Sequence, residues 1–322
     1  EMLELYPTTM LQMIAALIHK IPIVAIVNSE DQRCRAVTMI SDWGLQPNAV
    51  QFVSLPVTGM WIRDYGPTFV RARDGSILIL DADYLETDRP ADDLAPRTIA
   101  DLLRLPVIHV PLTIEGGNLL SNGHGLLLTT QKLFKRNAHR GLTQDQVSQL
   151  LQHHYGFDQC VVLRPLMGEP TGHVDMFATF VSPNTVVVGS YDPKVDPVNA
   201  DALNENARTL ERVETSVGKL NVVRIPMPSN RGSVFRSYTN VLMANGTLLM
   251  PQYPGIDSNG EAAARTLYQQ LLPDWEIIGI DSTRLIAHRG ALRCVSLNIP
   301  WMEQLFLSLS DSDNYRRPPR AA

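Results

Sequence analysis

Five polar residues of types that carry out chemistry recur along the chain at a nearly regular interval. They are Asp64, Asn118, Asp175, Asn240 and Cys294, and successive members are 54, 57, 65 and 54 residues apart. A period of this length is typical of repeat or propeller architectures, in which every unit places a residue at the same structural position. We therefore expect the five side chains to converge near an axis of approximate symmetry and to form a site there.

Cys294 is the candidate nucleophile, in the segment RGALRCVSLNIP, which we interpret as the end of a buried strand. A lone cysteine at such a position is commonly a small core residue. The segment PTGHVDMF offers His173 and Asp175 two positions apart, so on a strand both side chains face the same way. A histidine held charged by a carboxylate can donate a proton and help to ionise a nearby thiol. The alternative interpretation of this motif is a structural strand in which the hydrogen bonds of the histidine are satisfied and the residue has no catalytic role.

Two further carboxylates are candidates for the same site. Asp64 lies in the apolar and aromatic run MWIRDYGPTFV, and Glu115 opens EGGN, which follows the apolar run VIHVPLTI. Three carboxylates close together repel one another unless a cation, a metal or protonation relieves them. A planar guanidinium fits two carboxylates through paired hydrogen bonds, and Trp61 could cover its face. If residues 60–70 form a strand, Asp64 should face Cys294 across a cavity and Arg63 should not.

A divalent metal ion is the rival occupant, since His, Asp and Glu side chains can bind one together. The motif HVD holds a single histidine, however, and no second histidine lies at a usable spacing, so we predict no metal site. His153, His154 and Cys160 lie on or just after an amphipathic helix. We assign no role to the remaining candidates His109, His124, His139 and His288. The sequence contains neither GxSxG nor a P-loop.

Local patterns predict an α/β chain in which helices alternate with pairs of strands. Helical periodicity covers residues 8–20, 90–105, 143–157, 199–218 and 260–273. Hairpins with turn residues at their centres are predicted at 68–80, 118–130, 177–190 and 240–253. Residues 291–300 end the series without a partner strand. We expect a single catalytic domain over residues 1–312 and a disordered tail rich in arginine and proline over 313–322.

The composition fits a soluble globular protein, with 322 residues, 44% apolar and 19% charged. The net charge of −5 gives no indication of nucleic-acid binding. No apolar run of 18 residues is present, so we expect no membrane span. Three widely spaced cysteines argue against a disulfide framework and favour a cytoplasmic location, although a chain that begins at Glu1 leaves secretion open.

Taken in order, five motifs resemble one family. WIRDYGPTF, EGGN, TGHVDM, SYTNVLMANGTLLMPQY and the late Cys294 are similar to motifs of the agmatine deiminases and bacterial-type peptidylarginine deiminases. These enzymes belong to the guanidine-modifying superfamily with the pentein fold, a five-bladed α/β propeller of ββαβ units with approximate fivefold symmetry. The resemblance runs from about residue 60 to residue 300, and the counted period agrees with that fold.

The resemblance implies a role for each matched residue. Asp64 and Asp175 would bind the guanidinium nitrogens, His173 would be the general acid and base, and Glu115 would orient it. Cys294 would attack the guanidinium carbon and form a covalent thiouronium, which water would then hydrolyse. The resemblance also matches Asn240 to the site region. It implies no cofactor and a small cationic guanidino compound as the substrate, and it leaves a homo-oligomer open.

The segment around the cysteine departs from the family pattern. Agmatine deiminases typically read GGGNIHCITQQ there, whereas this chain reads HRGALRCVSLN, so Arg293 replaces a histidine and only Gly290 remains of the glycine triplet. Arg293 could favour the thiolate, could meet a substrate carboxylate, or could face away. We expect agmatine as the substrate, converted to N-carbamoylputrescine and ammonia. Free or peptidyl arginine is the alternative, and a non-catalytic pentein that binds a partner is a more distant one.

Overall fold

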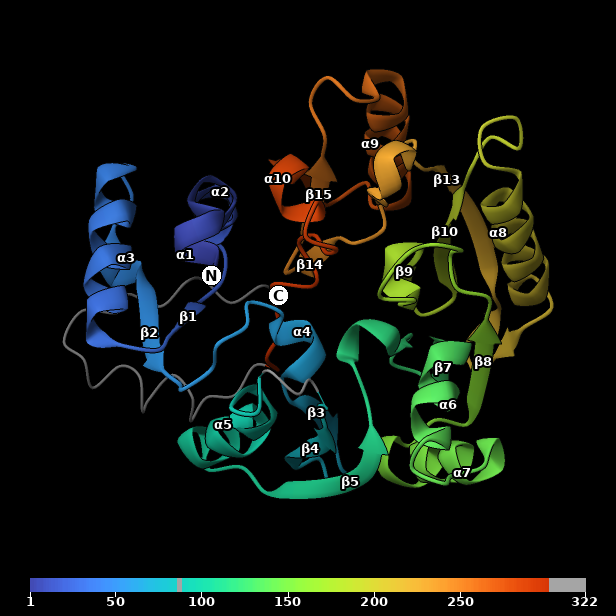
Figure 1. Cartoon of the computed structure of the whole chain (residues 1–322), viewed down its shortest axis with the longest axis horizontal. Helices are drawn as coiled ribbons and strands as arrows, with labels where there is room; N and C mark the ends of the chain where they lie inside the picture. The colour runs from blue at the N-terminus through green and yellow to red at the C-terminus, as the bar shows by residue number, and fades with distance from the viewer. Residues whose placement is uncertain (86–88, 301–322) are drawn as a thin grey trace.

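The computed structural model describes residues 1–85 and 89–300, and these form a mixed α/β fold, as predicted. The strands make several small sheets that follow one another around the middle of the molecule, with most of the helices outside them (Figure 1). The tail predicted at 313–322 lies outside the described residues, as does the predicted end of the domain at residue 312. No helix of the described part is long and apolar enough to cross a membrane.

Four of the described sheets repeat one connection. In each, an antiparallel hairpin is followed by a helical crossover to a third strand, which pairs in parallel with the second strand of the hairpin. The four predicted hairpins are therefore confirmed. The strands are β3 Thr68–Arg71, β4 Ile77–Asp83 and β5 Val107–Thr113; β6 Leu120–Ser121, β7 Leu126–Thr130 and β8 Gln159–Leu163; β9 Ala178–Ser182, β10 Thr185–Ser190 and β13 Asn221–Pro226; and β14 Leu242–Ala244, β15 Thr247–Gln252 and β16 Glu276–Asp281.

The five predicted helices are present, with shifted ends. They are α2 Pro7–Leu17, α5 Ala95–Leu103, α7 Gln144–Tyr155, α8 Pro197–Leu210 and α9 Ser258–Leu271. The helix predicted over 199–218 ends earlier, because residues 214–219 form a small hairpin of β11 Glu214–Thr215 and β12 Gly218–Lys219. The sequence patterns missed α3 Glu30–Asp42 and α6 Gln131–Ala138, and the short helices α1 Met2–Leu5 and α10 Thr283–Ile286.

The N-terminal segment joins the first and last parts of the chain. Strands β1 Ile23–Val27 and β2 Val50–Ser54 pair in parallel across α3. Helix α2 packs instead on the last sheet, where Leu17 is buried with Leu249 and Ile280. Thr9 Oγ1 donates a hydrogen bond to the carbonyl oxygen of Asp281 at 2.9 Å. Leu11 and Ile14 of the same helix are buried with Val50 of β2, so α2 joins the sheets at the two ends of the described chain.

Buried asparagines attach helices to the preceding sheet. Asn137 of α6 accepts a hydrogen bond from the Thr113 amide and donates one to its carbonyl oxygen, both at 2.9 Å, at the end of β5. Asn206 of α8 binds the backbone of Arg164 in the same way after β8, again with two bonds of 2.9 Å. A side-chain amide satisfies a buried peptide N–H and C=O at once, so each contact fixes one repeat against the next.

We expect Asn206→Ala to lower the free energy of unfolding by about 2–4 kcal/mol, because two buried backbone groups of Arg164 lose their partners. The matched control is Asn48→Ala, at an exposed position, which should change it by less than about 0.5 kcal/mol. Urea denaturation followed by circular dichroism measures both. Equal stability of the two variants would show that the asparagine does not join the repeats.

Candidate active site

The segment that contains Asp64 is a helical turn and not a strand. Residues Ile62–Tyr65 form the short helix α4, and Gly66 then extends the chain before Pro67, as residues before proline do. The condition on which the directions of Asp64 and Arg63 were predicted is therefore not met at these residues, and strand β3 begins only at Thr68. The Arg63 side chain lies beside the Arg293 carbonyl oxygen, with Nε at 3.4 Å, and lines a cavity of about 370 Å³ together with Arg293.

Glu115 and its two glycines follow strand β5, as the pattern predicted. Glu115 caps a single 3-10 turn, η3 Gly116–Asn118. A Cβ on Gly116 would lie 2.1 Å from the Arg63 carbonyl oxygen, and one on Gly117 would lie 2.5 Å from His173 Nδ1. Both glycines are therefore required by close approach of other parts of the site.

His173 lies between two carboxylates in the interior. Its Nε2 is 3.0 Å from Glu115 Oε2, and its Nδ1 is 3.6 Å from Asp64 Oδ1. Asp64 Oδ1 also accepts a hydrogen bond from the Gly117 amide at 2.9 Å. The HVD motif itself is a 3-10 turn, η4 Val174–Met176, preceded by His173, so the strand expected there is wrong.

Cys294 lies in a turn over residues 292–295, so the buried strand predicted for this segment is also wrong. The thiol is buried, and its Sγ lies 3.3 Å from Asn240 Nδ2 and 3.5 Å from Asn240 Oδ1. Trp61 packs beside it: a Cβ on Gly290 would lie 2.4 Å from the Trp61 ring and 3.0 Å from Cys294 Cβ. Gly290 thus makes room for the indole next to the thiol.

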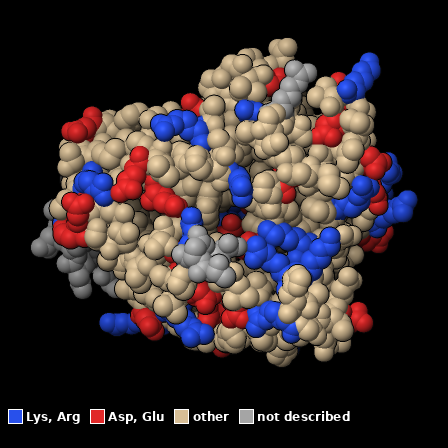
Figure 2. Space-filling model, in the orientation of Figure 1, with Lys and Arg blue, Asp and Glu red and all other residues tan. Residues whose placement is uncertain are grey.

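Hydrogen bonds connect the turns that carry the five recurring positions in a closed ring. Each bond joins one turn to the next, and the last returns to the first: Gly117 N to Asp64 Oδ1 at 2.9 Å, Val174 N to Asn118 Oδ1 at 3.1 Å, Thr239 Oγ1 to the Asp175 carbonyl oxygen at 3.3 Å, Arg293 N to Asn240 Oδ1 at 3.0 Å, and Arg63 N to the Cys294 carbonyl oxygen at 3.2 Å. The structure therefore brings the five predicted positions together. Acidic and basic side chains both reach the middle of the face shown in Figure 2.

Basic side chains neutralise this acidic region, and the sequence patterns missed two of them. Lys132 Nζ lies 3.0 Å from Glu115 Oε2, and Arg136 Nη2 lies 2.7 Å from Glu115 Oε1. Both come from α6, where they are four positions apart and so share a face of the helix. Arg293 Nη1 lies 2.6 Å from Asp175 Oδ2. In the described residues, no group of three or more His, Cys, Asp or Glu side chains is arranged to hold a metal ion.

The carboxylates keep His173 charged. Burial alone would lower the pKa of His173, but Asp64 and Glu115 outweigh it and raise the pKa to about 9. Burial would raise the pKa of Glu115, but the hydrogen bond and charge of His173, with Lys132 and Arg136, lower it to about 2. Burial raises the pKa of Asp64 to about 6 against the opposing charge of His173. The imidazolium is therefore the form present at neutral pH.

The surroundings of Cys294 disfavour its thiolate form. Burial raises the pKa of its thiol well above the usual value, and the charges of Asp175 and Asp64 raise it further. Burial lowers the pKa of Arg63 to about 9, and the like charge of Arg293 contributes to the shift. A cation placed between the two aspartates would offset the charges that oppose the thiolate.

A family model of the Porphyromonas-type peptidyl-arginine deiminases matches residues 1–300. The chain belongs to this family. The resemblance predicted from the motifs is thereby confirmed, and the chain is a hydrolase of carbon–nitrogen bonds in linear amidines.

Individual relatives are distant but similar over most of their length. A candidate agmatine deiminase of Legionella pneumophila is 28% identical over 271 residues, which are 80% of this chain and 76% of that protein. The agmatine deiminase of Ectopseudomonas mendocina is 26% identical over 292 residues, 80% of this chain and 78% of its own. The crystal structure of a candidate arginine deiminase from Porphyromonas gingivalis superimposes with a TM-score of 0.79 at 26% identity, over 91% of this chain and 89% of that one.

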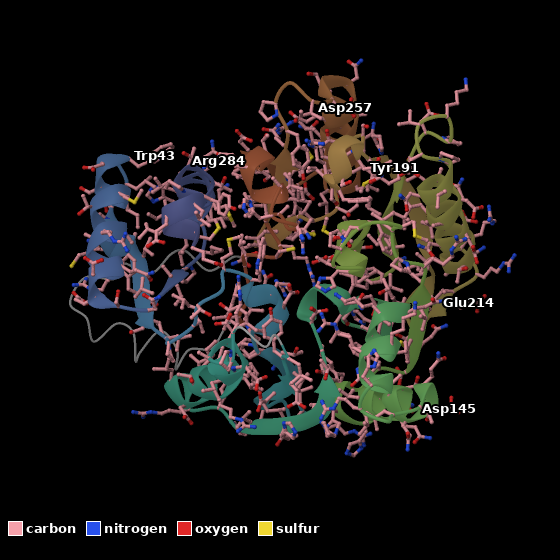
Figure 3. All side chains as sticks on the ribbon, in the orientation of Figure 1. Trp43, Asp145, Tyr191, Glu214, Asp257 and Arg284 are labelled. Atoms are coloured by element: carbon pink, nitrogen blue, oxygen red, sulfur yellow. The ribbon has the colours of Figure 1, made fainter. Side chains whose placement is uncertain are left out.

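We expect the His173 ring to titrate near pH 9 in an NMR experiment, and Glu115→Gln to lower that midpoint by at least about one pH unit, since it removes a carboxylate that favours the imidazolium. The control is Glu214→Gln, at the edge of the molecule (Figure 3), which should leave it unchanged. A wild-type midpoint near the usual histidine value, or one that Glu115→Gln does not move, would contradict the charge assignment.

Proposed function

We propose that the protein is a guanidine deiminase in which Cys294 is the nucleophile and His173 the general acid and base. The observation that carries this proposal is the grouping of the buried Cys294 thiol, the buried His173 ring and two aspartates, of which Asp175 is fully buried and Asp64 is 13% exposed. Such a site lacks a metal-binding arrangement in the described residues, and it suits a flat cation that can be attacked at carbon.

The substrate guanidinium would bind between Asp64 and Asp175. Asp175 is fully buried, and its Oδ1 has no hydrogen-bond partner in the described residues. An unpaired buried carboxylate oxygen is costly, and a guanidinium N–H would satisfy it. Trp61, which packs next to Cys294, would cover the guanidinium plane, and Asn240 would hold the sulfur in place.

The reaction would proceed in two displacements. As the cation binds, the Cys294 thiol gives its proton to solvent water and the sulfur attacks the guanidinium carbon, forming a C–S bond while one C=N electron pair moves to nitrogen. His173 then gives its proton to one amino group, the C–N bond breaks, and ammonia leaves a thiouronium on the cysteine. A water molecule next gives a proton to His173 while its oxygen attacks the same carbon. The C–S bond breaks, and the proton of the added hydroxyl passes to the sulfur, which releases the ureido product and restores the Cys294 thiol.

Agmatine is the substrate we propose, with N-carbamoylputrescine as the product. The support comes from the relatives named agmatine deiminases and from the donors of Arg293, which already bind Asp175 and two backbone carbonyl oxygens. The Arg293 guanidinium is therefore not available to bind the carboxylate of an amino-acid substrate. Free or peptidyl arginine is the second candidate, favoured by the family description and the Porphyromonas gingivalis neighbour.

We also propose that the repeated units form a five-bladed propeller of pentein type within one domain, supported by the repeated strand order and the ring of hydrogen bonds. The unpaired state of Cys34, Cys160 and Cys294 supports a cytoplasmic location. A pentein that only binds a partner has no need of a charged histidine beside a buried thiol, so catalysis is the better account.

We expect purified protein to release ammonia from agmatine faster than from free arginine or arginyl peptides. Cys294→Ser should lower kcat by at least about 10³-fold, because the hydroxyl is a far weaker nucleophile. The control is Cys34→Ser, at an exposed position, which should retain wild-type activity with the same melting temperature. Turnover of any guanidine by a folded Cys294→Ser variant at the wild-type rate would refute the nucleophile. Faster ammonia release from free arginine or arginyl peptides than from agmatine would favour arginine as the substrate.

A further inference from the structure

Arg293, the residue before the cysteine, holds the carboxylate of Asp175. Its Nη1 lies 2.6 Å from Asp175 Oδ2 and 3.5 Å from the Gly116 carbonyl oxygen, and its Nη2 lies 3.1 Å from the Leu119 carbonyl oxygen. Sequence alone left open whether this side chain faced the site, and the structure decides that it does. Its guanidinium connects the turns of HVD, EGGN and the cysteine.

The two oxygens of Asp175 differ sharply in their surroundings. Oδ2 is bound by Arg293, whereas Oδ1 is buried without a hydrogen-bond partner among residues 1–85 and 89–300. Asp175 is completely buried, and the Arg293 side chain is only 13% exposed. A carboxylate held by one oxygen cannot rotate its other oxygen away without breaking a buried ion pair.

We propose that Arg293 is a positioning residue that binds Asp175 Oδ2 and so fixes this carboxylate with Oδ1 directed at the substrate guanidinium. The inference rests on the proposed function, since it assigns Asp175 to guanidinium binding. It also explains the departure from the family pattern around the cysteine: the arginine here provides from within the protein a cation for one side of Asp175.

The surroundings of Asp175 show why a cation is needed there. The groups that interact with its charge are the acids Asp64 and Cys294 and the bases Arg63, His173 and Arg293. Of these bases, Arg293 is the one in direct ionic contact in the described residues. Arg293 thus supplies a fully buried carboxylate with the ion pair that burial of its charge requires.

A lysine cannot reproduce the whole arrangement. The planar guanidinium makes separate bonds to a carboxylate and to two carbonyl oxygens, whereas an ammonium is a point charge without this fixed geometry. A lysine at this position would nevertheless keep a positive charge beside Asp175. Charge and geometry can therefore be tested separately with Arg293→Lys and Arg293→Gln.

The experiment measures kcat and KM for the best guanidine substrate at pH 7 in wild type, Arg293→Gln and Arg293→Lys. We expect Arg293→Gln to lose about 10²-fold in kcat/KM, the cost of a misplaced binding group. The loss should appear mainly as a higher KM, because Asp175 Oδ1 binds the guanidinium in the ground state and in the transition state alike. Arg293→Lys should lose only about tenfold, again mainly in KM, because it keeps a positive charge beside Asp175 without the planar geometry. Arg284→Ala, at the edge of the molecule (Figure 3), is the control and should match wild type.

Each outcome is decisive. A loss in Arg293→Gln that falls on kcat with KM unchanged would mean that Arg293 does not position the binding carboxylate, which overturns the inference. Equal activity of Arg293→Gln and wild type would overturn it as well. If wild type itself turns over no guanidine, the proposed function fails, and this result is distinct from an active wild type whose KM is unchanged by Arg293→Gln.

Discussion

Three carboxylates buried within one small region impose the constraint on which the rest of this structure depends. The side chains of Asp64, Glu115 and Asp175 are 13%, 9% and 0% exposed. Carboxylates so placed must each meet a cation or hydrogen-bond donors, or take up a proton. The partners come from different parts of the chain: His173, Lys132 and Arg136 for Glu115, the Gly117 amide and His173 for Asp64, and Arg293 for Asp175. These ion pairs and hydrogen bonds hold the turns together around the three carboxylates.

Short turns, and not strands, carry the site because backbones must approach one another there. Gly116, Gly117 and Gly290 each lie where a Cβ would collide with a backbone oxygen, a histidine or an indole. The sheets and helices outside this ring position the turns, and the buried asparagines attach α6 and α8 to the preceding sheets. The reacting side chains are thus held by hydrogen bonds between turns, which suits a site that must present a thiol and an imidazolium in fixed positions.

Much of this could be predicted from the sequence, because hairpins and amphipathic helices follow from local patterns and the five recurring positions from their period. The strand end predicted at Cys294 was wrong, and the strands considered at Asp64 and His173 are short turns, since the alternation of polar and apolar residues does not distinguish a strand from a turn that tertiary contacts hold. The partner of Arg293 could not be predicted either. Asp175 lies 118 residues away in the chain, and only the fold brings the two together. Lys132 and Arg136, which bind Glu115, were missed because they lie on helix α6, which has only eight residues and was not predicted.

The central claim is that the guanidinium carbon of the substrate forms a covalent bond to the sulfur of Cys294. A single turnover with enzyme in excess over agmatine, quenched in acid after milliseconds to seconds and followed by peptide mass spectrometry, tests it most directly. The account predicts a transient adduct with the mass of the substrate less ammonia, on the Cys294 peptide and on neither the Cys34 nor the Cys160 peptide. Complete conversion in that first turnover with Cys294 unmodified at every time point would contradict it.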